Sequence, residues 1–105
     1  MTIVTRKLPT ADDVEILADE RWVDGIVDAV LSRPHDVPQG VRFAKVSRDR
    51  YADGRESVRV TTAEIGDRLM PTTPYQAGPL ANYRGVASSD VEADVAKARA
   101  WIASA

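Results

Sequence analysis

Cysteine is absent from this chain of 105 residues, and His35 is its single histidine. The missing thiols exclude disulfide bonds, thiolate zinc sites and cysteine nucleophiles. With one histidine, a transition-metal site would need mostly carboxylate ligands, and the Glu-x-x-His pairs of bundled di-iron centres are missing. His35 lies beside Asp36 in a proline-flanked stretch without a nucleophile elbow, which favours a surface loop over a catalytic triad. We therefore predict no catalytic residue and no bound metal.

Long hydrophobic runs are missing as well. No stretch approaches the roughly 20 apolar residues that span a membrane, and the N-terminal residues lack the apolar core of a signal peptide. The glycines are scattered and match neither a phosphate-binding loop nor a dinucleotide-binding motif. We expect a cytoplasmic protein that has no membrane partner and carries no cofactor.

The composition is that of an ordinary globular protein. Hydrophobic residues make up 44% of the chain, charged residues 29%, and the formal net charge is −2. These values argue against wholesale disorder and give no global reason to expect nucleic acid. The length predicts a single domain covering residues 1–105. An excess of arginine over lysine, with many alanines and valines, is typical of a GC-rich genome and indicates a bacterial or phage source.

Residues 10–33 predict a long N-terminal helix. Thr10-x-x-Asp13 resembles a capping box, and Pro34 would end the helix. At 100° per residue, an aliphatic face is formed by Ile16, Val23, Ile26, Val27 and Val30. A second line is an acidic ridge of Asp13, Glu20, Asp24 and Asp28. Gly25, a poor helix residue, would mark a close crossing or a kink.

The rest of the chain predicts a hairpin and a second helix. Residues 41–48 and 57–62 alternate in polarity around the turn signal Asp53-Gly54. Ser89-x-x-Glu92 opens a helix that runs to about Ala103. The expected fold is α+β, with the long N-terminal helix and the C-terminal helix packed on one face of a small antiparallel β-hairpin. Residues 2–5 are a candidate third strand.

Residues 63–70 predict a further, short helix, because Thr61-x-x-Glu64 is another capping box. Residues 61–69 also look like the first helix of a helix-turn-helix motif. The resemblance covers these residues alone. Three prolines fall where the recognition helix would follow, and each would break it: Pro71, Pro74 and Pro79. The sequence therefore gives this motif little support.

A loop rich in proline and tyrosine, residues 71–83, is the first candidate binding site. Tyrosine is enriched at protein interfaces, and proline lowers the entropy lost on ordering. The expected protein-binding residues are Tyr75, Leu80 and Tyr83 in the loop, with Trp22 and Trp101 on the two helices. The alternative is that the loop closes over the core of its own domain.

Basic residues of the hairpin are the second candidate site. They are Arg42, Lys45, Arg48, Arg50, Arg55 and Arg59. Such a cluster with Tyr51 nearby is a candidate for phosphate contacts in nucleic acid. The alternative, which we favour, is that these residues neutralise the acidic ridge of the first helix.

The sequence therefore favours a non-enzymatic protein-binding or assembly module of accessory, regulatory or phage-encoded type. It would act through the apolar helix face and the Pro/Tyr loop, on a protein partner or on a second copy of itself. The alternative is a small nucleic-acid-binding protein that uses the Arg-rich hairpin. A third class is an enzyme subunit that works through carboxylates and arginines.

Overall fold

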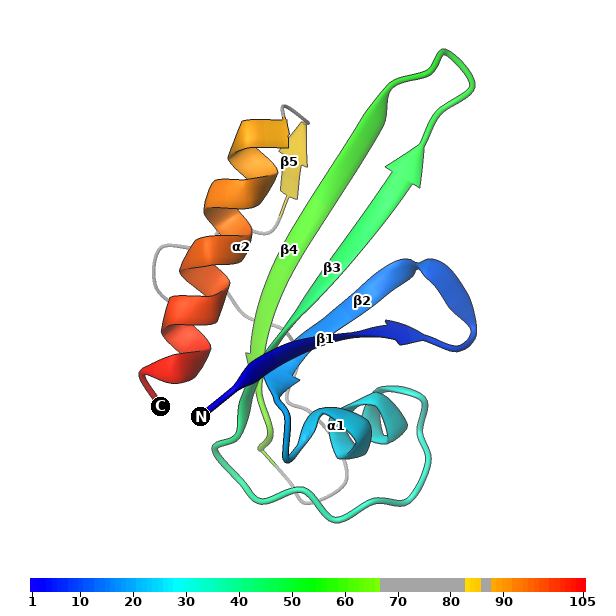
Figure 1. Ribbon diagram of the computed structural model, residues 1–105. Helices are drawn as coiled ribbons and strands as arrows, with labels where there is room; N and C mark the ends of the chain where they lie inside the picture. The colour runs from blue at the N-terminus through cyan, green and yellow to red at the C-terminus, as the bar shows by residue number, and fades with distance from the viewer. Residues whose placement is uncertain (67–82, 86–87) are drawn as a thin grey trace.

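A computed structural model of the chain describes residues 1–66, 83–85 and 88–105. Two strands precede the first helix, and three strands separate it from the second (Figure 1). In chain order the elements are β1 (Ile3–Leu8), β2 (Ala11–Asp19), α1 (Val23–Val30), β3 (Arg42–Arg50), β4 (Glu56–Glu64), β5 (Tyr83–Gly85) and α2 (Ser88–Ala103).

The strands form one antiparallel sheet in the order β1-β2-β3-β4-β5, so each strand pairs with its neighbour in sequence. Pro9 and Thr10 join the first pair, in which Leu8 faces Ala11. The β3–β4 turn closes where the Tyr51 amide donates to the Arg55 carbonyl at 2.9 Å. Gly54 has a φ of +86° there, a conformation that glycine adopts without strain. A meander of this kind needs only local connections.

The predicted long N-terminal helix is wrong. Residues 10–33 contain a turn, the strand β2, a second turn and the eight-residue helix α1. In β2, Ile16 and Ala18 belong to one core, whereas Leu17 between them belongs to another. Apolar residues that appeared to surround a helix are the two buried faces of a central strand, whose period is two rather than 3.6.

Two hydrophobic cores lie on opposite faces of the sheet. The α1-side core consists of Leu8, Ile16, Ala18, Val23, Ile26, Val37, Phe43, Ala63 and Ile65. The α2-side core consists of Leu17, Ala44, Val46, Val58, Val60, Val91, Ala98 and Ile102. The expectation that both helices cover the same face is therefore also wrong. Each helix buries its own face of the sheet (Figure 1).

Two further predicted elements are present in the structure. The hairpin is confirmed, because β3 and β4 pair from Arg42 opposite Glu64 to Arg50 opposite Glu56. The C-terminal helix is confirmed as α2, which begins at Ser88. The short helix predicted for residues 63–70 and the helix-turn-helix resemblance of residues 61–69 are wrong as far as Glu64, because residues 61–64 end β4. Four β-branched residues favour a strand there: Val58, Val60, Thr61 and Thr62. Residues 67–70 lie outside the described residues.

Gly25 marks a close approach between α1 and the segment that follows it. A Cβ atom at this position would lie 2.5 Å from His35 Cδ2 and 2.8 Å from Val37 Cγ2. Val37 is fully buried in the α1-side core. The absence of a side chain at Gly25 therefore lets this segment pack onto the helix, in agreement with the predicted close crossing.

Candidate binding sites

The tip of the β3–β4 hairpin projects beyond its neighbour β2 (Figure 1), which pairs with β3 only between Phe43 and Ser47. Tyr51, at this tip, is 49% exposed. Among the described residues, Tyr51 and Met1 are the only large hydrophobic residues that are exposed. The Arg55 guanidinium carbon lies 5.7 Å from the centroid of the Tyr51 ring, and Arg55 Nε donates to Asp53 Oδ2 at 2.6 Å. The tip thus presents an aromatic ring with a cation held against it.

Most basic residues of the hairpin are in ion pairs within the hairpin itself. Glu56 pairs with Arg48 at 3.7 Å and with Arg50 at 3.3 Å. Arg55 pairs with Asp53 at 2.6 Å, and Arg42 with Glu64 at 3.2 Å. These pairs lower the net charge that the hairpin offers to a phosphate backbone.

The predicted acidic ridge does not exist as one line, because Asp13 lies in β2 and Glu20 in the turn before α1, so only Asp24 and Asp28 share the helix. Asp24 pairs with Arg6 at 3.3 Å, and Asp28 pairs with Arg33 at 3.8 Å and with His35 at 3.4 Å. None of these three basic residues belongs to the hairpin. The interpretation that the hairpin neutralises the ridge is therefore wrong for the ion pairs among the described residues.

A polar face of the hairpin remains on the α1 side. Lys45 lies opposite Thr61, and Ser47 opposite Arg59, on the same face as the buried pair Phe43 and Ala63. Within residues 1–66, 83–85 and 88–105, none of the four polar side chains makes an ion pair or side-chain hydrogen bond. Two cations and two hydroxyl groups thus share one face.

The expected protein-binding residues are not gathered at one place. Trp22 and Trp101 are half-buried against the α1-side and α2-side cores, respectively. Tyr75 and Leu80, with most of the Pro/Tyr loop, lie outside the described residues. Tyr83 begins β5, and its side chain lies outside the description too.

The apolar helix faces are internal. In α1 the buried residues include Val23 and Ile26, and in α2 they include Val91, Ala98 and Ile102. The sequence predicts that an apolar helix face acts in partner binding. The sheet is larger than the predicted hairpin and offers two faces, so it covers the apolar helix faces itself.

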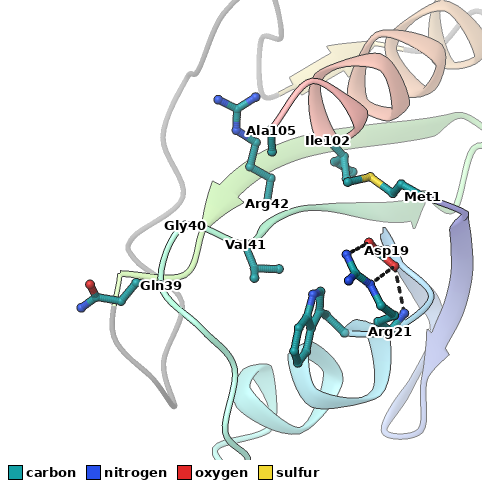
Figure 2. Close-up of a pocket in the computed structure, with 10 residues that line it drawn as sticks. Met1, Asp19, Arg21, Gln39, Gly40, Val41, Arg42, Ile102 and Ala105 are labelled. Atoms are coloured by element: carbon teal, nitrogen blue, oxygen red, sulfur yellow. Dashed lines mark hydrogen bonds and ion pairs between the residues drawn. The ribbon is translucent and has the colours of Figure 1, made fainter.

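The third candidate is a cavity of about 220 Å³ where the ends of β2 and α2 meet the start of β3 (Figure 2). It is lined by Met1, Asp19, Arg21, Trp22, Gln39, Gly40, Val41, Arg42, Ile102 and Ala105. We call it the seam cavity, because it lies where both helices approach the same end of the sheet.

Asp19 and Arg21 form one wall of the seam cavity. The Asp19 carboxylate accepts hydrogen bonds from the Arg21 backbone amide and from Arg21 Nη2, each at 3.0 Å. Hydrogen bonding to the Arg21 side chain lowers the pKa of Asp19 from its ordinary value and raises that of Arg21. The pair is ionised at neutral pH.

Arg42 joins this region to the end of α2. Its Nη1 donates to the Trp101 carbonyl at 2.8 Å and to Ser104 Oγ at 2.9 Å, and its guanidinium carbon lies 4.6 Å from the Trp101 ring centroid. Because Nε is paired with Glu64, this arginine connects α2 with both strands of the hairpin. Arg42 was expected to contact nucleic acid, but its contacts are structural.

Sequence reasoning missed the seam cavity. Asp19 is the last residue of β2, and Arg21, Gln39 and Val41 come from connections, so their positions depend on where β2 ends and β3 begins. The available signal was a strand at residues 11–19 that is followed by a polar turn before Trp22. This pattern would have placed Asp19 and Arg21 at the end of a strand. The long-helix interpretation concealed it.

Comparisons with known proteins identified no relative of this chain. No protein-family model matches the chain, and searches of curated proteins and of solved structures found no significant match. Neither helix that the structure describes is long and apolar enough to cross a membrane. In the same described ranges, no three side chains of His, Cys, Asp or Glu are grouped to hold a metal ion.

Proposed function

We propose that this protein is a non-enzymatic protein-binding module of accessory or regulatory type that docks through the tip of its β3–β4 hairpin. The observation that carries the proposal is Tyr51, a half-exposed aromatic side chain held beneath Arg55 on a projecting arm. Tyrosine and arginine are enriched among the residues that dominate protein interfaces. A tyrosine loses little conformational freedom on binding and offers an apolar ring with a polar end.

The ionic pattern of the tip favours a protein partner over nucleic acid. Arg50 and Arg55 each have a carboxylate partner on the hairpin, at 3.3 and 2.6 Å. A phosphate backbone would have to compete with these carboxylates, whereas a protein surface can meet an alternating pattern of charges around an aromatic centre. The proposed site of action is the cytoplasm.

The test is comparative affinity capture from a lysate of the source cells. The wild type, Tyr51→Ala and Tyr51→Phe serve as baits, with Lys97→Ala as a control at an exposed position of α2. We expect one defined protein to be captured by the wild type, Tyr51→Phe and Lys97→Ala, and to be lost with Tyr51→Ala. With the purified partner, Tyr51→Ala should weaken binding by about thirtyfold, the effect of an interface residue worth about 2 kcal/mol. Equal capture by Tyr51→Ala and the wild type would refute the proposal.

A second candidate function is nucleic-acid binding through the polar face of the hairpin. Its support is that Lys45 and Arg59 share this face with Ser47 and Thr61, and that neither cation has an ion-pair partner among the described residues. Unpaired cations are available to phosphates, unlike the paired arginines at the tip.

This candidate is tested with a fluorescent single-stranded oligonucleotide at low and high salt. Binding through phosphates should weaken steeply as salt rises and should fail in a Lys45→Ala/Arg59→Ala double variant. The matched control is Arg50→Ala/Arg55→Ala, which removes the same charge from the tip. Binding that both double variants retain, or that salt leaves unchanged, would exclude this face as a nucleic-acid site.

A further inference from the structure

The seam cavity is large enough for a molecule built on a single ring. Its volume is about 220 Å³, and a closed apolar cavity of about 150 Å³ accommodates benzene. We infer that it binds a small carboxylate with an apolar body, of the size of a single-ring aromatic acid. This site is separate from the hairpin tip, so the inference does not depend on the proposed function.

The apolar part of the lining would hold the body of such a ligand. Trp22, Val41 and Ile102 contribute an indole and two branched aliphatic side chains from three different segments. Ile102 is 1% exposed and closes the back of the cavity, whereas Trp22 and Val41 are only partly buried and offer the contact surface. Gly40 has a φ of +87°, and a Cβ there would meet nothing within 4 Å, which leaves this stretch of the lining open. The lining combines an apolar majority with few polar groups, as small-molecule sites do.

The polar wall selects the charge of the ligand. The Asp19 side chain is 6% exposed and is covered by its bonds to Arg21, whereas the Arg21 side chain is 70% exposed. A ligand therefore meets the guanidinium first. Arg21 uses Nε and Nη2 on Asp19, and its Nη1 makes no hydrogen bond with any residue that the structure describes. That N–H group can donate to a carboxylate.

An ammonium ligand fits this wall poorly. To replace Arg21 it would have to reach a buried carboxylate that already accepts three hydrogen bonds. The Arg21 guanidinium also lies 5.8 Å from the Trp22 ring centroid, so cation and ring are neighbours at the entrance. An aromatic acid can place its ring near Trp22 and its carboxylate on Arg21 in one orientation.

The experiment is a titration of the full chain followed by ¹H–¹⁵N NMR, with three probes of similar size: phenylacetate, benzyl alcohol and benzylamine. We expect phenylacetate to cause saturable shifts at the amides of Trp22, Val41 and Ile102. It should bind about tenfold more tightly than the alcohol or the amine, because a charge-assisted hydrogen bond adds to the same ring contact. Equal binding of the three probes, or no saturable shift at about 20 mM phenylacetate, would overturn the inference.

The second part of the experiment replaces the Arg21 side chain. Arg21→Gln should lower the affinity for phenylacetate about tenfold while leaving that for benzyl alcohol unchanged. Arg33→Gln, at another exposed arginine, is the matched control and should change neither. Unchanged phenylacetate affinity in Arg21→Gln would refute the role of Arg21. If this variant fails to fold, the comparison of charged and neutral probes on the wild type still decides the question.

An apolar carboxylate can be a free metabolite or the last residue of a polypeptide. Two tetrapeptides that end in phenylalanine distinguish these sources, one with a free carboxylate and one amidated. If the free peptide alone shifts the seam-cavity amides, the natural ligand is a polypeptide terminus. If phenylacetate binds and neither peptide does, the natural ligand is a small acid. Shifts of equal size with both peptides would contradict recognition of a carboxylate.

Discussion

The two faces of the hairpin differ in what covers them. On the α2 side, Val46, Val58 and Val60 continue the core along β3 and β4 beneath the 16-residue helix α2. On the α1 side, the apolar surface ends at Phe43 and Ala63, beyond which Lys45 and Arg59 lie on the same face. Helix α1 has eight residues and covers one end of the sheet (Figure 1).

The difference shows that the length of a helix determines how much of a sheet face it covers. An unpartnered charge is costly to bury, and the buried strand residues beneath α2 are accordingly aliphatic or, like Thr62, polar but uncharged. The short helix leaves the far end of its face to polar residues. Candidate binding groups therefore lie at the hairpin end that α1 does not cover and at the seam where both helices approach one edge. The following four predictions test this comparison, from the largest expected effect to the smallest.

Adjacent residues of β2 test whether the two cores are independent. Ile16 and Leu17 are both buried and belong to the α1-side and α2-side cores, respectively. Each substitution, Ile16→Ala and Leu17→Ala, should reduce the free energy of unfolding by about 2–5 kcal/mol. Urea denaturation followed by circular dichroism measures both values. A marginal effect at either position would show that its face carries no core.

Gly25→Ala should destabilise the α1 side by about 1–3 kcal/mol. Alanine is about 1 kcal/mol better than glycine in a helix, so propensity alone predicts the opposite sign. The added Cβ would collide with His35 and Val37, at 2.5 and 2.8 Å. Thermal and urea unfolding measure the change. In a His35→Ala background the penalty should be smaller, because one of the two colliding side chains is gone. A stabilised Gly25→Ala variant would contradict the close approach.

Arg42→Ala should destabilise the α2 side by about 1–3 kcal/mol, because it removes hydrogen bonds from a charged donor. It also removes the contact with the Trp101 ring, so Trp101 fluorescence in a Trp22→Phe background should report a more mobile end of α2. Arg42→Lys should not restore the loss, because lysine lacks the forked geometry. The control, Arg50→Ala, breaks an exposed ion pair and should change stability by about 0.5 kcal/mol or less. Equal effects would argue against a special role for Arg42.

Asp19→Asn should make stability less dependent on pH. Arg21 lowers the pKa of folded Asp19, so the carboxylate stabilises the fold above its unfolded pKa of about 3.9. This contribution is lost as the pH falls through the folded pKa. At pH 7 the variant should therefore be less stable than the wild type, and the gap should narrow below about pH 4. Urea unfolding at several pH values measures the difference in stability between the wild type and the variant. A difference that does not change with pH would show that the Asp19 carboxylate is not the source of the pH dependence.

Local patterns predicted the elements that depend on neighbours in sequence. Asp53-Gly54 between two alternating stretches was enough for the β3–β4 hairpin, and the Ser89-x-x-Glu92 capping box was enough for α2. The failure was in residues 10–33. Val23, Ile26 and Val30 do lie on one helix, and their period was extended back over β2, where Ile16, Leu17 and Ala18 are all buried. A strand buried on both faces and an apolar helix have similar composition.

The candidate sites were predictable only in part. The basic residues of the hairpin were identified, but their separation into paired arginines and the unpaired Lys45 and Arg59 depends on the register of β3 against β4. That register places Glu56 near two arginines and leaves the polar face without acids close enough for an ion pair among the described residues. The Asp19 and Arg21 wall was missed because it exists only where β2 ends.

The sequence by itself determined that no cysteine chemistry is available, that the chain has a hairpin near its middle and that a helix lies near its end. Composition and short-range periodicity carry this information. The tertiary structure alone decided that residues 11–19 form a two-faced strand, that each helix has its own core, and that a cavity lies where the ends of β2 and α2 meet the start of β3. The physical reason is that a buried residue is defined by what packs on it. The partners of β2 are its sequence neighbours β1 and α1 together with β3 and α2, which lie much farther along the chain.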